Sequence, residues 1–163
     1  MNQIRTFAVT VVVVLAFAVF AAQKPAAGKN EQAGSATDSS LEYSSAKSAG
    51  SRPFSDVVRV GKTLYLSGKL GTDSSGKLAP GGIAGETKQA LENIRAVLEA
   101  NGSSMDNVVK CTVMLADIKE WADMNTVYTT FFRKDRMPAR SAFATSGLVL
   151  NARVEIECIA TVK

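Results

Sequence analysis

Two short stretches near the carboxyl end of the sequence hold the residues that could do chemistry. In Pro138-Ala139-Arg140-Ser141, an arginine follows a rigid proline at the start of a predicted strand. A guanidinium held there could bind a carboxylate through two parallel hydrogen bonds. In the final predicted strand, Glu155 could position or activate a water molecule. Taken alone, Arg140 is more simply explained as a surface cation, so its role depends on the elements around it.

The composition excludes several kinds of site. The 163 residues include no histidine, which removes Ser-His-Asp triads, Cys-His pairs and every histidine-ligated metal site. Two isolated acidic residues, Asp73 and Asp117, are predicted to form turns rather than to bind a metal. We therefore expect no metal site.

The two cysteines, Cys111 and Cys158, lie in apolar stretches 47 positions apart, without a Cys-x-x-Cys motif. Each is predicted to act as a small buried hydrophobe rather than as a nucleophile. The sequence leaves open whether the two side chains meet or form a disulfide.

The charge balance argues against a nucleic-acid partner. The chain has 19 basic and 15 acidic residues, for a formal charge of +4. A nucleic-acid-binding domain usually carries a stronger basic excess, often interleaved with aromatic residues. We therefore expect no nucleic-acid partner.

Hydrophobic periodicity predicts strands that alternate with two helices. Apolar residues recur every three or four positions in the predicted helices, and the predicted strands are short and β-branched. Gly61-Lys62 is expected to join the first two strands as a hairpin. The predicted strands cover 57–60, 63–67, 108–116, 141–146 and 153–162, and the predicted helices cover 83–100 and 119–133. This order indicates one sheet covered on one face by two helices.

The last predicted strand alternates between apolar and charged residues. Side chains expected to face the helices are Val154, Ile156, Cys158 and Ala160, and those expected to face away are Arg153, Glu155 and Glu157. The charged face is most simply a solvent surface, and the alternative is a cleft or subunit contact. The aromatic stripe of the second predicted helix is expected to pack in the core rather than to bind a ligand.

The amino-terminal part of the chain has the layout of an export signal. One basic residue in 1–5 precedes an apolar run over 6–22. We predict a signal peptide or membrane anchor over 1–22, a flexible linker rich in Ser, Ala and Gly over 23–52, and one domain over 53–163. The expected location is therefore periplasmic or secreted, with a membrane tether as the alternative.

The predicted domain carries motifs that resemble those of the RidA family, also called the YjgF/YER057c/UK114 family. They are Gly61-x-x-Leu64-Tyr65-Leu66-Ser67-Gly68, Thr87-x-Gln89-Ala90-Leu91-x-Asn93-Ile94, Val108-Val109-Lys110-x-Thr112-Val113, Met124-Asn125-x-Val127-Tyr128-x-x-Phe131-Phe132, Pro138-Ala139-Arg140-Ser141 and Val154-Glu155-Ile156-Glu157-x-Ile159-Ala160. The resemblance runs from Pro53 to Lys163, and the motifs occur in the family's order and spacing.

The resemblance implies a chorismate-mutase-like α+β fold, with a six-stranded mixed sheet and two helices on one face. It also implies a homotrimer with clefts between subunits. Family members hydrolyse reactive 2-enamines and 2-imines to 2-keto acids and ammonia without a cofactor. The expected partners are therefore small-molecule 2-imino or 2-enamino acids and two further copies of the chain.

The resemblance also implies roles for individual residues. Arg140 would anchor the substrate carboxylate and Glu155 would hold the attacking water. Ser67 and Gly68 would form part of the cleft wall, and Asn125 would border it.

The sequence departs from the family pattern at three positions of the expected cleft. Ala142, whose backbone carbonyl would face the water, stands where many members have cysteine. Phe54 replaces a cleft tyrosine and Lys69 replaces a common glutamine. These changes bear on substrate range and rate.

Two alternatives to the enzyme are a trimeric module that binds small carboxylates without turnover and, less favoured, a ribonuclease or translation inhibitor.

Overall fold

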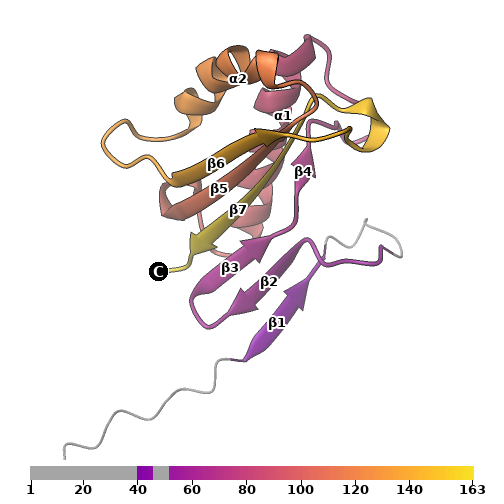
Figure 1. The fold of residues 1–163 in the computed structure, drawn as a ribbon. Coiled ribbons are helices and arrows are strands. Elements are labelled where there is room, and N and C mark those ends of the chain that lie inside the picture. Colours follow the sequence, from indigo (N-terminus) through magenta and orange to yellow (C-terminus); the bar gives the residue numbers. More distant parts are fainter. Residues whose placement is uncertain (1–39, 46–51) are drawn as a thin grey trace, which may run out of the picture. The chain divides into compact units, whose positions relative to one another are not determined.

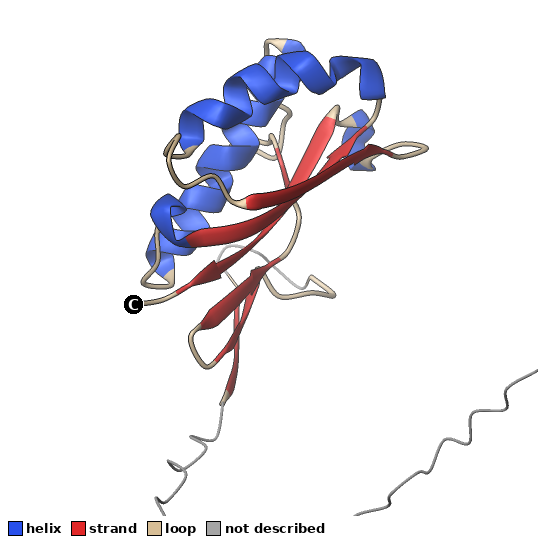
Figure 2. Ribbon diagram, turned by 60° about the vertical axis from the view of Figure 1, so that its left-hand side comes forward, coloured by secondary structure: helices blue, strands red, loops and turns tan. Residues whose placement is uncertain are grey.

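The computed structural model of the chain describes residues 40–45 and 52–163, and Figure 1 shows how their helices and strands are arranged. The predicted signal or anchor over 1–22 and most of the predicted linker lie outside these residues. Within the described part, one mixed sheet carries two α-helices on one face, as Figure 2 also shows. This is the α+β arrangement that the sequence predicts. No helix among the described residues is long and apolar enough to cross a membrane.

Over residues 40–45 and 52–163 the sheet has seven strands rather than the expected six. They are β1 (Leu41–Ser44), β2 (Val57–Val60), β3 (Thr63–Leu66), β4 (Lys69–Leu70), β5 (Val108–Leu115), β6 (Ala139–Ala144) and β7 (Val154–Thr161). Their order is β1-β2-β3-β7-β5-β6, and the two-residue β4 pairs with β7 beyond the end of β3. Strands β5 and β6 run parallel, and the other pairs are antiparallel.

Strand β1 lies inside the segment over 23–52 that the sequence predicts to be a linker. It pairs with β2, from Leu41 opposite Val60 to Ser44 opposite Val57, and all four of its side chains are exposed. The linker prediction rests on the scarcity of large apolar side chains, whereas β1 is held through backbone pairing. Composition therefore could not reveal it.

The first hairpin follows the sequence prediction. Val60 pairs with Thr63, so Gly61 and Lys62 form a two-residue turn between β2 and β3. Gly61 adopts a positive φ of 56°, a conformation that the absence of a Cβ makes accessible.

Helix α1 (Gly82–Ala100) confirms the first predicted helix. Its buried residues recur at spacings of three and four: Ile83, Glu86, Thr87, Ala90, Leu91, Ile94 and Leu98. The helix ends where the sequence predicts, at Asn101 followed by Gly102 with a φ of 75°. The apolar stripe packs against β7 and β4, which fixes the face of the sheet that is covered.

The second predicted helix is shorter than expected. Helix α2 (Trp121–Tyr128) is flanked by single 3-10 turns over Ile118–Glu120 and Thr129–Phe131. The first turn begins at Asp117, whose side chain accepts a hydrogen bond from the backbone N–H of Lys119 at 2.9 Å. The prediction that Asp117 forms a turn is confirmed, as is the core position of Met124 and Tyr128.

Alternation along the central strands divides the sheet into two faces. On β7, Val154, Ile156, Cys158 and Ala160 are buried toward the helices, as predicted. We call this the covered face and the opposite one the open face. Directly paired residues on neighbouring strands share a face, so the register assigns every strand residue to one of the two.

Candidate active site

Arg140 lies on the covered face at the edge of the sheet. It is the second residue of β6 and pairs with Cys111 of β5, which pairs with Cys158 of β7. Strand β6 ends the sheet on this side, and α2 precedes it in the chain. The proline turn before β6 therefore delivers the guanidinium to the carboxyl-terminal half of α2.

Three side chains of α2 hold the guanidinium of Arg140. Asn125 Oδ1 accepts a hydrogen bond from Arg140 Nη1 at 2.8 Å. Arg140 Cζ lies 4.5 Å from the ring centroid of Tyr128 and 5.5 Å from that of Trp121, both within the range of cation–π attraction. We call Arg140, Asn125, Tyr128 and Trp121 the Arg140 cluster. One amide and two aromatic rings hold the cation in place before any substrate binds.

A cavity of about 210 Å³ opens beside this guanidinium. It is lined by Asn125, Tyr128, Thr129, Met137, Pro138 and Arg140. Its volume suits a molecule of a few heavy atoms better than a drug-sized ligand. A small carboxylate is therefore a ligand that fits both the charge and the size of the site.

Sequence reasoning assigned the aromatic stripe of α2 to the core alone. Tyr128 is indeed buried, but together with Trp121 it also packs against the arginine. A signal was present in the sequence, because Trp121, Asn125 and Tyr128 follow one another at spacings of four and three, on one face of a helix. This spacing could not indicate that the three side chains contact Arg140, because the arginine lies on β6 and not on the helix.

Glu155 lies on the open face of β7. It pairs with Met114 of β5, and Met114 pairs with Phe143 of β6, in a row that faces the side opposite to Arg140. The side chain is half-buried, and neither an ion pair nor a hydrogen bond is found for it among residues 40–45 and 52–163. Burial, and next the negative charge of Glu157, raise the pKa of Glu155 above its ordinary value.

Gly68 makes room for this carboxylate. A Cβ placed on Gly68 would collide with Oε1 of Glu155, so no other residue fits without displacing the acid. Before it, the Ser67 hydroxyl donates a 2.6 Å hydrogen bond to the carbonyl oxygen of Ser55. Phe54 lies next to Ser55 in the chain, and its side chain is 53% exposed. We call Glu155, Gly68 and Ser67 the Glu155 cluster.

The two clusters do not meet within one chain. The register places Arg140 on the covered face and Glu155 on the open face, with β5 between their strands. Of the predicted site residues, the structure brings Asn125 to Arg140 and brings Gly68 to Glu155. Ala142 shares the covered face with Arg140 and packs against the core. A site that uses both charged residues therefore needs a second chain.

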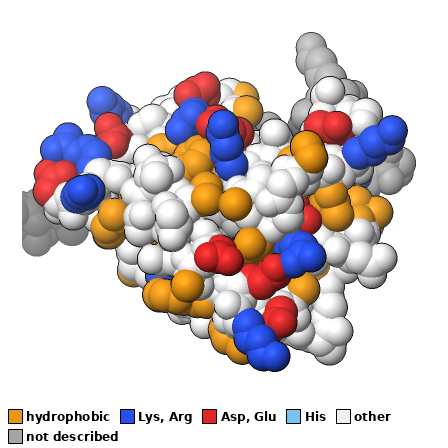
Figure 3. All heavy atoms as spheres, turned by 90° about the horizontal axis from the view of Figure 1, so that it is seen from above, with side chains coloured by type: hydrophobic (Ala, Val, Ile, Leu, Met, Phe, Trp, Pro, Cys, Tyr) orange, Lys and Arg blue, Asp and Glu red, His pale blue; other side chains and the backbone are white. Residues whose placement is uncertain are grey.

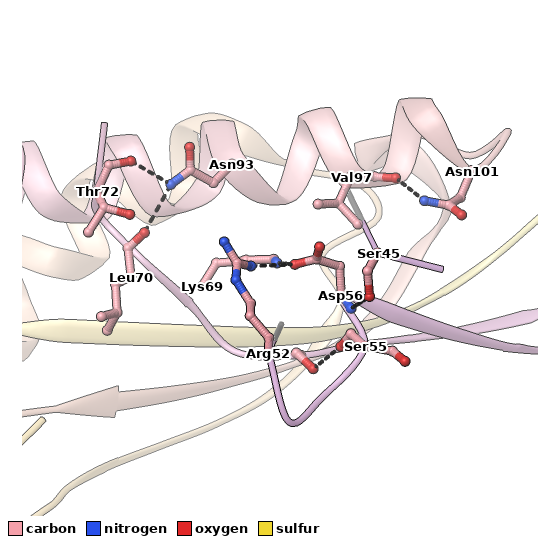
Figure 4. A network of polar contacts seen from close by, with 11 residues as sticks. Ser45, Arg52, Ser55, Asp56, Lys69, Leu70, Thr72, Asn93, Val97 and Asn101 are labelled. Carbon is pink, nitrogen blue, oxygen red and sulfur yellow. Dashed lines mark hydrogen bonds and ion pairs between the residues drawn. The ribbon is translucent and has the colours of Figure 1, made fainter. Parts of the chain in front are cut away.

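Lys69 follows Gly68 but turns away from Glu155. It pairs with Ile156 on the covered face, and its ammonium group forms an ion pair with the carboxylate of Asp56 (Figure 4). A larger cavity of about 390 Å³ adjoins Asp56 and α1. Because Arg52 also lies 3.3 Å from this carboxylate, the acid is already neutralised. The Lys69 substitution thus bears on this network and not on the Glu155 cluster.

The described residues offer no site for a metal ion: no group of three or more Cys, Asp or Glu side chains comes together in that part of the chain. Asp73 accepts hydrogen bonds from the Ser75 and Lys77 backbone N–H groups, so its predicted role in a turn is confirmed. These hydrogen bonds, with the one from the Ser75 hydroxyl first, lower the pKa of Asp73.

Comparison with known proteins agrees with the fold and the motifs. The sequence model of a family described as Endoribonuclease L-PSP matches residues 44–162. The chain is 50% identical over 109 residues to the 2-iminobutanoate/2-iminopropanoate deaminase of Bos taurus, covering 66% of this chain and 79% of that protein. A crystal structure from Yersinia pestis, titled as a protein of unknown function of the conserved Rid family, superimposes with a TM-score of 0.70. The two sequences are 34% identical, and the superposition covers 76% of this chain and all of the Yersinia pestis chain.

The crystal structure of RidA from an Antarctic Psychrobacter gives a TM-score of 0.65 at 35% identity, covering 74% of this chain and 94% of that chain. The matched region contains both the Arg140 and the Glu155 clusters. By this match the chain belongs to the Endoribonuclease L-PSP family, the family of RidA and YjgF.

Proposed function

We propose that this chain hydrolyses reactive 2-enamines and 2-imines derived from amino acids, giving 2-keto acids and ammonia. Relatives named 2-iminobutanoate/2-iminopropanoate deaminase support the reaction. The observation that carries the proposal is the Arg140 guanidinium, which is held by one amide and two rings beside a small cavity. Every substrate of this reaction carries a carboxylate next to the reacting carbon, and this cation is suited to bind it.

Arg140 would bind and orient the substrate carboxylate. A guanidinium donates two parallel hydrogen bonds to a carboxylate, which fixes the plane of the bound group as well as its position. Holding the reacting carbon beside a bound water replaces an encounter in solution by a step within one complex. Orientation is the main demand, because an imine carbon is already electrophilic.

Glu155 would hold and activate the water. In the proposed reaction the water oxygen forms a bond to C2 of the imino acid and Glu155 accepts one of its protons, while the π electrons of the C=N bond move to the nitrogen, which takes that proton from Glu155. Collapse of the resulting carbinolamine moves the hydroxyl proton to the nitrogen and breaks the C–N bond, which releases ammonia and leaves the 2-keto acid. A half-buried carboxylate with a raised pKa is a better base than a solvated one.

The two residues would meet between neighbouring subunits of a homotrimer. Arg140 and Glu155 face opposite sides of the sheet, so a cleft that uses both takes one from each of two chains. Large apolar side chains accompany Glu155 on the open face, where Tyr65 is 48% exposed and Phe143 is 46% exposed. Exposed apolar side chains of this kind are typical of surfaces that pack against another chain.

The family description as an endoribonuclease raises a second candidate function. Figure 3 views the molecule from above and shows acidic and basic side chains interspersed, without a basic stripe on this face. RNA binding usually requires clustered positive charge and exposed aromatic residues for base stacking. We therefore favour the deaminase, or failing that a module that binds small carboxylates without turnover.

We also propose that the protein acts outside the cytoplasm, on imines formed there. This proposal rests on residues 1–22 of the sequence. A reporter enzyme that is active only after export, fused after Arg52, would show activity if the segment exports or tethers the domain. An inactive reporter whose fusion protein accumulates in the cytoplasm would contradict the proposal.

The experiment that tests the function uses the purified full-length chain and an amino acid oxidase that generates 2-imino acids continuously. Semicarbazide traps the surviving imine, so deaminase activity appears as slower semicarbazone formation. The activity of the Arg140→Ala variant should be lower by about ten- to a hundredfold or more. This is the loss in rate that corresponds to the free energy of one charge-assisted hydrogen-bonded contact. Arg95→Ala is a matched control, because Arg95 also lies over an aromatic ring, at 5.0 Å from Phe131, but far along the chain on α1.

We expect the wild-type protein to accelerate imine hydrolysis, Arg140→Ala to lose this activity and Arg95→Ala to keep it. That result would support both the reaction and the carboxylate site. A folded oligomer that accelerates hydrolysis of neither small nor large imino acids would contradict the deaminase. If that protein still bound 2-keto acids through Arg140, its proposed function would instead be the binding of small carboxylates without turnover.

A further inference from the structure

The two cysteines of the chain lie directly opposite each other on neighbouring strands. Cys111 of β5 pairs with Cys158 of β7 in an antiparallel register, and both side chains point to the covered face. Their sulfur atoms are 2.7 Å apart. The side chains are 0% and 2% exposed, and neither takes part in the proposed deamination.

The sheet itself sets the backbone spacing that a disulfide needs. Directly opposed residues of an antiparallel pair have Cα atoms about 4.5 or 5.5 Å apart, depending on the type of pair. A disulfide accepts Cα separations of about 4.4–6.8 Å. Cys111 and Cys158 could therefore be bridged by side-chain rotation, with β5 and β7 staying paired.

The two thiols are not equivalent. The hydrogen bond shared with Cys158 lowers the pKa of Cys111, and the positive charges of Lys110 and of Arg140, which pairs directly with Cys111 across β5 and β6, act in the same direction. The contact with Cys111, and next burial, raise the pKa of Cys158, which lies one strand further from Arg140. Cys111 is therefore the sulfur that more readily becomes a thiolate, which is the nucleophilic form.

We propose that Cys111 and Cys158 form an intrachain disulfide that links β5 to β7, with Cys111 as the attacking sulfur and a hydroperoxide as the oxidant. The Cys111 thiolate attacks one oxygen of hydrogen peroxide, the O–O bond breaks, and hydroxide leaves, so that Cys111 becomes a sulfenic acid. The Cys158 sulfur then attacks the Cys111 sulfur, and the sulfenic oxygen leaves as water. In sum, two thiols and one peroxide give one disulfide and two waters.

The bridge would lie next to Arg140, on the same face of the sheet. Arg140, Cys111 and Cys158 form one row across β6, β5 and β7 on the covered face. A crosslink between β5 and β7 joins residues 47 positions apart and restricts the unfolded chain strongly. The oxidised chain should therefore resist thermal unfolding better than the reduced one.

The test treats the folded full-length chain with hydrogen peroxide, removes the excess with catalase, and then unfolds the chain in iodoacetamide. We expect the treated chain to take up no acetamide group and to weigh about 2 Da less than the reduced chain. Digestion without reductant should join the peptides that contain Cys111 and Cys158, and dithiothreitol should separate them. The midpoint of thermal unfolding should rise by roughly 5–15 °C on oxidation and return on reduction.

Single variants test the order of the two steps. In Cys158→Ala, peroxide should leave a Cys111 sulfenic acid that dimedone labels, whereas Cys158 in Cys111→Ala should stay unlabelled. The wild-type mass and peptide measurements do not depend on the variants folding. Two cysteines that still alkylate after peroxide, a bridge between chains, or a sulfinic acid in place of the disulfide would each overturn the proposal. Equal dimedone labelling of the two variants would overturn the assignment of Cys111 as the attacking sulfur.

Discussion

The Arg140 cluster is completed by its own chain, whereas the Glu155 cluster is not. Arg140 has an amide acceptor and two aromatic rings around its guanidinium. Glu155 has the space left by Gly68 on one side, and no cation among the described residues lies against it. The first arrangement stabilises a charge, and the second leaves a charge poorly solvated, as the raised pKa of Glu155 indicates.

This difference fits two different tasks. A group that binds a substrate charge gains from being fixed beforehand, because less order is lost on binding. A group that must take up a proton gains from an environment that does not stabilise its charge, because its proton affinity is then higher. In the proposed function, the folded chain therefore builds the carboxylate-binding half, and a neighbouring subunit would close the half that holds Glu155.

The largest expected effect comes from removing the charge of Glu155 while keeping its shape. Glu155→Gln should lower kcat by about a hundredfold or more, the range typical of a general base, with little change in carboxylate binding. The trapping assay gives kcat, and titration with a 2-keto acid product gives the binding constant. A large loss of product binding with an unchanged kcat would assign Glu155 to the binding half and remove the contrast between the clusters.

The next effect tests whether the clusters come from different chains. Arg140→Ala and Glu155→Gln subunits, inactive separately, are co-expressed with different tags and isolated as mixed oligomers. Every mixed cyclic trimer contains one cleft in three that pairs an intact Arg140 with an intact Glu155. Roughly a third of the wild-type activity should therefore return. Mixed oligomers that stay inactive would mean that both residues serve the same subunit or do not act together.

A smaller effect probes the contact that positions Glu155. Gly68 is absent from the residues with positive φ, so the approach of the Glu155 carboxylate is what excludes a side chain there. Gly68→Ala should cost about 1 kcal/mol of unfolding free energy, the low end of the cost of overpacking, because the colliding atoms end a side chain that can move aside. In a Glu155→Ala background the same substitution should cost much less, because the colliding group is gone. Equal costs in both backgrounds, measured by denaturant unfolding, would show that Gly68 serves another contact.

The same comparison explains how far the sequence could predict the structure. The periodicity of α1 and the alternation of β7 are local signals, and both were confirmed. The separation of Arg140 and Glu155 onto opposite faces is not local, because a slip of one residue in the β5–β6 or β5–β7 register would reverse it. The packing of Trp121 and Tyr128 on Arg140, and the backbone pairing of β1, likewise depend on elements that are distant in the sequence.

The smallest expected effect separates the two causes of the raised pKa of Glu155. Glu157 lies two residues along β7, on the same open face, and its charge is the second cause after burial. The proposed base works in its ionised form, so activity should fall as pH drops through the pKa of Glu155. Glu157→Gln should lower that pKa and move the acidic limb of the rate profile to lower pH, while kcat on the plateau stays the same. Glu99→Gln, an exposed carboxylate at the end of α1, is the matched control.

The linkage to stability has a defined sign. Because the pKa of Glu155 is higher in the folded chain than in the unfolded one, ionisation opposes folding. This loss of folding stability is absent at pH values below the pKa that Glu155 has in the unfolded chain. It grows as pH rises through the pKa that Glu155 has in the folded chain. Glu157→Gln should therefore reduce, but not remove, the loss of stability over that interval, because burial of Glu155 remains. An acidic limb that does not move would mean that the groups completing the cleft, and not Glu157, control the proton affinity of Glu155.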